Sequence, residues 1–179
     1  MPELSILAER CSHQRIAHAH CTACVAACPR SAWRMHTDGL GFDPDACDDC
    51  GLCVAACPLE ALALPAPVPI ITATQPRSLL LACDHSAVQS SGASAGQVAC
   101  IHALGPDLLL DWASRHHART IRLATGDCSG CARNPANPAD TLQARWRPVA
   151  QRAAAQGLPA PVLGPISAAQ WQALTRKSD

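Results

Sequence analysis

Cysteine is the residue type in this chain whose spacing is most specific for chemistry. Cys47, Cys50, Cys53 and Cys57 form the run C-x2-C-x2-C-x3-C-P, which ends at Pro58. Thiolates bind soft metals, and four thiolates at this spacing are typical of the ligands of an iron–sulfur cluster. Zinc sites more often pair one C-x2-C with a second pair a dozen or more residues away. The run therefore favours a cluster over zinc.

Most of this run occurs a second time, 29 residues upstream. The six residues C-V-A-A-C-P are identical in the two copies, and the cysteines of the first copy are Cys21, Cys24 and Cys28. Two copies predict two cubane [4Fe-4S] clusters in a pseudo-two-fold unit, in which neither half closes a core alone. The same offset from Cys47 leads to His18, so one expected cysteine is replaced, and Cys11 is the spare thiol nearby.

Over about residues 11–64 the chain resembles the bacterial-type two-cluster ferredoxins, on these cysteine runs. The resemblance implies an α+β ferredoxin-like fold and crossed ligation, in which the last cysteine of each run binds the other cluster. Carried onto this sequence, one cluster has the ligands Cys28, Cys47, Cys50 and Cys53. The other has three ligands from the family pattern, which are Cys21, Cys24 and Cys57.

Two residues are candidates for the fourth ligand of that other cluster. We favour Cys11, because cubane clusters are normally held by four thiolates. His18 stands where the family has cysteine, and its neutral imidazole would raise the reduction potential. A third alternative is an open corner, which gives a three-iron cluster.

Composition limits the compartment and the function classes. Twelve cysteines in 179 residues are typical of secreted disulfide scaffolds, but residues 1–20 carry charges and no apolar leader. We therefore expect the reducing cytoplasm, where thiols bind metals. The most apolar segment, residues 61–74, contains three prolines, so no direct membrane insertion is expected. The formal net charge is zero without a basic run, which argues against nucleic-acid binding.

The chain divides into a cluster domain over residues 1–64, a proline-rich extended connector over 65–77, and a second domain over 78–179. A turn is expected at residues 38–41 and a small-residue loop at 90–96. Strands that alternate with helices predict a small α/β domain with a parallel sheet. The expected strands span 78–83, 97–101 and 120–125. The expected helices span 106–118 and 140–156, and a capping box at Ser167–Gln170 opens the last one.

The second domain holds four further cysteines, of which three lie in or just after predicted strands: Cys83, Cys100, Cys128 and Cys131. The carboxyl ends of parallel strands meet at one edge, so these thiols are expected to form a site for a [2Fe-2S] cluster or zinc. Two alternatives remain: Cys83 as a small buried hydrophobe, and Cys128 with Cys131 as a redox dithiol. His85 and His102 follow two of these cysteines, and hydrogen-bonding or surface roles are expected for both.

The element order and Gly126-Asp127-Cys128 are similar to the iron–sulfur delta subunit of methyl-viologen-reducing hydrogenase, over about residues 78–134. That resemblance implies a two-iron cluster and electron transfer towards a heterodisulfide-reductase-type partner. Together the resemblances imply an electron-transfer protein, a ferredoxin-type subunit or dedicated carrier for a larger oxidoreductase, with no catalytic residue assigned. The alternatives are a cluster-bearing sensor or assembly factor for a metalloenzyme, and redox catalysis at Cys128 and Cys131.

Overall fold

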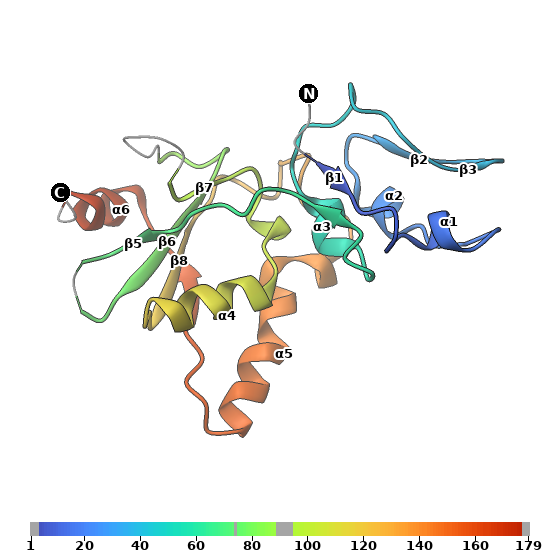
Figure 1. Ribbon diagram of the computed structural model, residues 1–179. Helices are drawn as coiled ribbons and strands as arrows, with labels where there is room; N and C mark the ends of the chain where they lie inside the picture. The colour runs from blue at the N-terminus through green and yellow to red at the C-terminus, as the bar shows by residue number, and fades with distance from the viewer. Residues whose placement is uncertain (1–3, 74, 89–94, 177–179) are drawn as a thin grey trace.

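The computed structural model describes residues 4–73, 75–88 and 95–176. Figure 1 shows the N-terminal part of the chain on one side and the larger C-terminal part on the other, with α3 at the boundary. Among the described residues, no helix is long and apolar enough to cross a membrane. Most of the small-residue loop expected at 90–96 lies outside the described residues.

The N-terminal part consists of short elements around two equivalent helices. Its helices are α1 (Ser12–Arg15), α2 (Ala23–Ala27) and α3 (Leu52–Ala56). Its strands are β1 (Ser5–Ile6), β2 (Trp33–His36), β3 (Gly39–Phe42) and β4 (Leu62–Ala63). β1 pairs antiparallel with β4, and this pairing ties the start of the chain to the end of the second cysteine run.

The helices α2 and α3 end for the same local reason. Each is followed by a cysteine in an extended conformation, Cys28 or Cys57, with ψ of 108° and 111°. The next residue is Pro29 or Pro58, and a proline disfavours helical geometry in the residue before it. The sequence repeat is therefore a structural repeat of helix, extended cysteine and proline.

The strands β2 and β3 form a hairpin between the two repeats, with Trp33 opposite Phe42 and His36 opposite Gly39. The turn predicted at residues 38–41 is placed too late, because Gly39–Phe42 is strand and the chain reverses at residues 37–38. The Trp33 and Phe42 rings pack together at a centroid distance of 4.6 Å, with their planes tilted by 35°.

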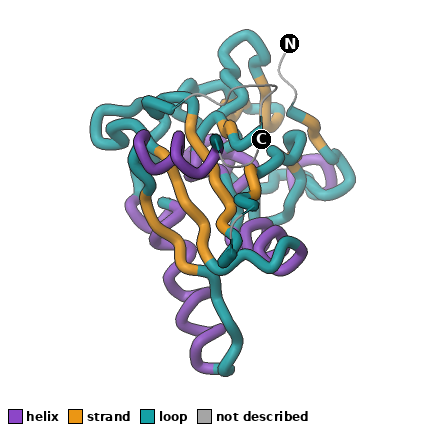
Figure 2. The backbone as a smooth tube through the Cα atoms, turned by 90° about the vertical axis from the view of Figure 1, so that its left-hand side faces the viewer, coloured by secondary structure: helices purple, strands orange, loops and turns teal. Residues whose placement is uncertain are grey.

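The C-terminal part is built on a mostly parallel sheet, whose strands are drawn in orange in Figure 2. Its strand order is β5-β6-β8-β9, and β7 also pairs with β6. The strands are β5 (Ile70–Ile71), β6 (Ser78–Cys83), β7 (Gln97–Val98), β8 (Thr120–Ala124) and β9 (Val162–Pro165). Its α-helices are α4 (Pro106–Arg115), α5 (Leu142–Ala155) and α6 (Ala168–Thr175). Two 3-10 turns complete it, η1 (Ile101–Ala103) and η2 (Pro138–Asp140).

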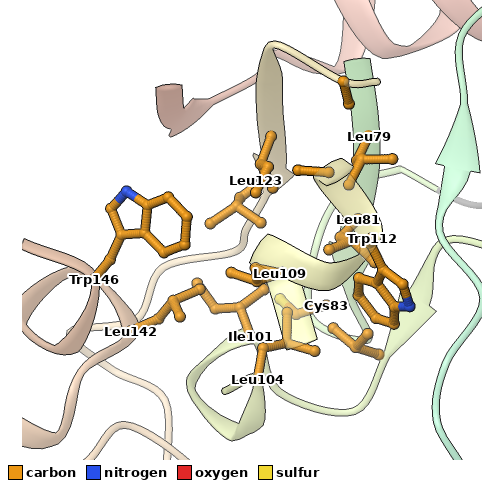
Figure 3. Close-up of a cluster of buried hydrophobic side chains, with 14 residues drawn as sticks. Leu79, Leu81, Cys83, Ile101, Leu104, Leu109, Trp112, Leu123, Leu142 and Trp146 are labelled. Atoms are coloured by element: carbon orange, nitrogen blue, oxygen red, sulfur yellow. The ribbon is translucent and has the colours of Figure 1, made fainter. Parts of the chain in front are cut away.

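Alternation along β6 gives the sheet two buried faces, as expected of a parallel sheet covered on both sides. Leu79, Leu81 and Cys83 face α4 and α5, and Leu80 and Ala82 face α6. Figure 3 shows the first of these faces, with Leu109 and Trp112 of α4 and Leu142 and Trp146 of α5 beside the strand. Each fully buried leucine contributes roughly 1.5–3 kcal/mol to stability.

The predicted elements of this part are present with shifted ends. Strand β6 has the predicted bounds, and the capping box of α6 is confirmed: the Ser167 hydroxyl accepts from the Gln170 N–H, and Gln170 Oε1 accepts from the Ser167 N–H. The strand predicted at 97–101 stops at Val98, because it pairs only with the last two residues of β6. The connector predicted at 65–77 is not a spacer throughout, since Ile70–Ile71 pairs antiparallel with β6.

Candidate metal centres

The cysteines expected to hold one cubane line a single small cavity of about 10 Å³, and they are Cys28, Cys47, Cys50 and Cys53. We call this cavity site B. Cys28 comes from the end of α2, and the other three come from α3 and the loop before it. The structure thus brings together one cysteine of the first run with three of the second.

The cysteines expected to hold the other cubane line a second cavity of about 90 Å³, and they are Cys11, Cys21, Cys24 and Cys57. We call this cavity site A. Cys11 lies at the start of the short helix α1, and the His13 ring nitrogen Nε2 lies 2.6 Å from the Cys21 carbonyl oxygen. His18 is exposed, has a φ of 61°, and does not line the cavity. Of the two candidates for the fourth ligand, the structure places Cys11 with the others.

The backbone after each run donates a hydrogen bond to the crossing cysteine. The Ala32 N–H donates to Cys28 Sγ at 3.3 Å, and the Ala61 N–H donates to Cys57 Sγ at 3.3 Å. The two bonds are equivalent in the repeat. Hydrogen bonds to ligand sulfur stabilise negative charge there and are one of the means by which proteins set a cluster's reduction potential.

Trp33 lies between sites A and B and lines both cavities. Its side chain is buried, with 4% of its surface exposed, and occupies part of the space between the two sites. Burial raises the pKa of the Cys53 thiol, and a hydrogen bond from the Trp33 side chain to its sulfur acts in the opposite direction. Nothing in the cysteine pattern indicated this tryptophan.

All twelve cysteines are among the described residues and are free thiols. Burial raises the pKa of Cys24 to about 11 and that of Cys50 to about 12, with nearby acidic groups and thiols adding to the effect. Such thiols ionise at neutral pH only when a metal stabilises the thiolate. Within the described ranges, no three His, Cys, Asp or Glu side chains are arranged to hold a single metal ion.

The four cysteines of the C-terminal part also line one cavity, of about 20 Å³, and they are Cys83, Cys100, Cys128 and Cys131. We call this cavity site C. It lies at the carboxyl ends of β6 and β8 and beyond β7, at the sheet edge where the sequence placed it. The 128–131 segment turns tightly, because the Cys131 N–H donates to the Cys128 carbonyl at 3.3 Å.

Gly126 allows this turn to lie against the end of β6. A Cβ built at this glycine would lie 2.2 Å from the His85 carbonyl oxygen, which is inside any real contact distance. Asp127 then fixes the turn, since its Oδ1 accepts from the Ser129 N–H at 2.9 Å and from the Ser129 hydroxyl at 2.6 Å. The residues between the strand end and Cys128 are therefore shaped by packing and hydrogen bonding.

His102 lines site C and has a buried nitrogen without a hydrogen-bond partner among the described residues. Its Nδ1 accepts from the Leu142 N–H at 3.1 Å, so Nε2 carries the proton of the neutral ring. Burial, with the charge of Arg145 as the lesser cause, lowers the pKa of His102 and keeps it neutral. A centre bound at site C would offer sulfur atoms that could accept a hydrogen bond from this unpaired N–H. The other histidine of this pair, His85, is exposed.

The comparisons with known proteins agree with the N-terminal part of this description. A family model described as a 4Fe-4S dicluster domain matches residues 19–61. The matched range contains every proposed cubane ligand except Cys11. No curated protein and no solved structure matches the chain. The match supports an iron–sulfur domain of ferredoxin-like type at residues 19–61, with [4Fe-4S] binding and a role in electron transfer.

Proposed function

We propose that this protein carries single electrons through two [4Fe-4S] clusters, as a ferredoxin-type subunit or dedicated carrier for a larger oxidoreductase. One observation carries the proposal: the seven cysteines of an imperfect repeat, together with Cys11, line two cavities that share the buried Trp33. The donor sets suit cubanes, since each cavity is lined by four thiols and each has a crossing cysteine with a backbone N–H bonded to its sulfur.

In this proposal the ligands at site A are Cys11, Cys21, Cys24 and Cys57, and those at site B are Cys28, Cys47, Cys50 and Cys53. A bound cubane supplies a centre that gains and loses one electron. The protein controls the surroundings of the clusters. Trp33 occupies part of the space between the sites, the N–H groups of Ala32 and Ala61 stabilise charge on sulfur, and burial lowers the local dielectric.

We further propose that site C holds a metal centre, either a [2Fe-2S] cluster or zinc. Two observations support this proposal. Four thiols from three segments at one edge of the sheet line the same cavity, and the Nε2–H of His102 beside them has no hydrogen-bond partner among the described residues. Both centres accept four thiolates, so the ligand types do not choose between them. Zinc would require the four thiols to draw closer together, because no three such groups among the described residues are arranged around a single ion. Acid-labile sulfide in excess of the cubane content distinguishes them, because zinc carries none.

Two glycines of the site C loop provide a matched test of that centre. Gly126→Ala is expected to displace the 126–131 loop from the His85 backbone, at a cost of roughly 1–3 kcal/mol, and to lose the metal of site C. Gly130→Ala is the control, because its Cβ would meet nothing closer than Asp127 Oδ2 at 3.7 Å. Metal content and cubane EPR are the measurements. Equal metal retention in the two variants would refute the assignment of site C.

Electron transfer itself is tested by redox titration of anaerobic protein followed by EPR, and then by mixing the reduced protein with an oxidised viologen dye. We expect cubane signals that appear on reduction and return after repeated cycles, with about one electron delivered per cubane. Clusters that dissociate or degrade at each oxidation would contradict a carrier and indicate the alternative, a sensor or assembly factor.

A further inference from the structure

Sites B and C meet at a buried contact between the two parts of the chain. Cys50 of site B and Cys100 of site C pack together with Leu52 in one apolar cluster. The helix α3, which carries Leu52, packs against η1, which follows Cys100 directly (Figure 1). A thiol proposed as a ligand of one centre therefore lies in the same cluster as a thiol proposed for the next.

The start of α3 and η1 also approach each other closely at this contact. Gly51 has a φ of 77°, and a Cβ built on it would lie 2.9 Å from the Ala103 Cβ. Only a residue without a side chain fits between the start of α3 and η1. The two parts of the chain thus approach each other at the residue next to Cys50.

Arg133 spans this contact and binds three groups at once. Its Nε donates to Asp48 Oδ2 at 3.0 Å, and one terminal nitrogen donates to Asp84 Oδ2 at 3.3 Å and to the Ala99 carbonyl at 2.8 Å. Each partner is next to a proposed ligand or between two of them, since Asp48 lies between Cys47 and Cys50, Asp84 follows Cys83, and Ala99 precedes Cys100.

The burial of Arg133 and Asp48 distinguishes their ion pair from ordinary surface pairs, whereas Asp84 is half exposed. The Arg133 side chain is 16% exposed and that of Asp48 is 29% exposed. Partly shielded charges with several hydrogen bonds hold geometry more firmly than exposed pairs do.

We infer that Arg133 is a positioning residue that holds site C against site B. The sites then follow one another in the order A, B, C, and the contact between Cys50 and Cys100 is the junction between B and C. This inference rests on the proposed function. The inference also requires a [2Fe-2S] cluster at site C, because zinc has no one-electron chemistry, so zinc found at site C would overturn it. With that cluster bound, one electron crossing the junction would oxidise the centre at one site by one electron and reduce the centre at the other by one, with no proton required. The C-terminal part is thus an extension of the electron path and not an unrelated docking domain.

The test uses full-length anaerobic protein and three variants. Arg133→Gln removes the charge and the ion pairs, Arg133→Lys keeps the charge without the planar fork, and Arg115→Gln is the control. Arg115 forms an exposed pair with Asp111 on α4, at 2.8 Å and away from the junction. The measurements are metal and sulfide content, the reduction potential of each cubane, and hydrogen exchange at residues 48–52 and 99–103.

We expect Arg133→Gln to retain its metals, to exchange faster in both segments, and to lower the potential of the site B cubane relative to that of site A. Loss of a nearby positive charge disfavours added negative charge, so Arg133→Lys should restore the potential, and Arg115→Gln should change neither readout. Unchanged exchange and potential in Arg133→Gln, or loss of site B and C metals from it, would overturn the inference. Wild-type protein without cubane iron would instead overturn the proposed function.

Discussion

Cys11→Ser is expected to remove or convert one of the two cubanes, whereas His18→Ala leaves both intact. Cys11 lines site A with the other three thiols, and His18 is exposed outside it. A wild-type content of about eight cubane irons should fall to about four with the loss of a cubane, or to about seven if a three-iron cluster remains, beside any metal at site C. Iron and sulfide content per chain, with EPR of the reduced protein, measures the effect.

His18→Ala also serves as the matched control for this experiment, because it changes a residue of the same loop region that the structure leaves outside the site. The opposite pattern, with full iron in Cys11→Ser and a cluster lost in His18→Ala, would show that the histidine is the ligand. Such a result would also require a different path for the chain from Cys11 to Cys21 than the structure has.

Gly51→Ala is expected to destabilise the protein more than Gly157→Ala. Both glycines have positive φ, 77° and 67°, so both variants incur the cost of a left-handed backbone, about 1 kcal/mol or more. Only at Gly51 does the added Cβ collide, with Ala103 Cβ at 2.9 Å and Leu64 Cδ1 at 3.2 Å, while nothing lies within 4 Å of the one at Gly157. Overpacking adds roughly 1–3 kcal/mol.

Thermal unfolding of the metal-loaded protein measures this difference. We expect a larger fall of the Tm in Gly51→Ala, together with faster hydrogen exchange at the junction of α3 and η1. Equal Tm values for the two variants would contradict the close approach of the two parts of the chain and weaken the junction between sites B and C.

Elements with a strong local signal were predictable from the sequence. Strand β6 is a continuous apolar run, α4 starts at Pro106, and α6 begins with a capping box. The missed elements are short or lack periodicity. The strands β1, β4 and β5 have two residues each, and β9 includes Pro165, which disfavours a strand assignment although it is tolerated at a sheet edge.

The candidate sites show the same division between local and long-range information. The cysteine spacing indicated clusters, and the resemblance to two-cluster ferredoxins implied the two crossed sets of cubane ligands, apart from the choice between Cys11 and His18. The set at site C was expected from the predicted strand ends. Trp33, His102 and Arg133 carry no such signal, since their roles depend on contacts with residues far away in the sequence. Cys11 was favoured over His18 from the sequence by the preference of cubanes for four thiolates, and the path of α1 places Cys11 in the cavity with the other three thiols.

The most direct test of the central claim is the iron, sulfide and zinc content of anaerobically isolated protein, combined with EPR after dithionite reduction. The account predicts about eight cubane irons with matching sulfide and two interacting [4Fe-4S] signals, with any further metal assigned to site C. Colourless protein that contains zinc alone would contradict it.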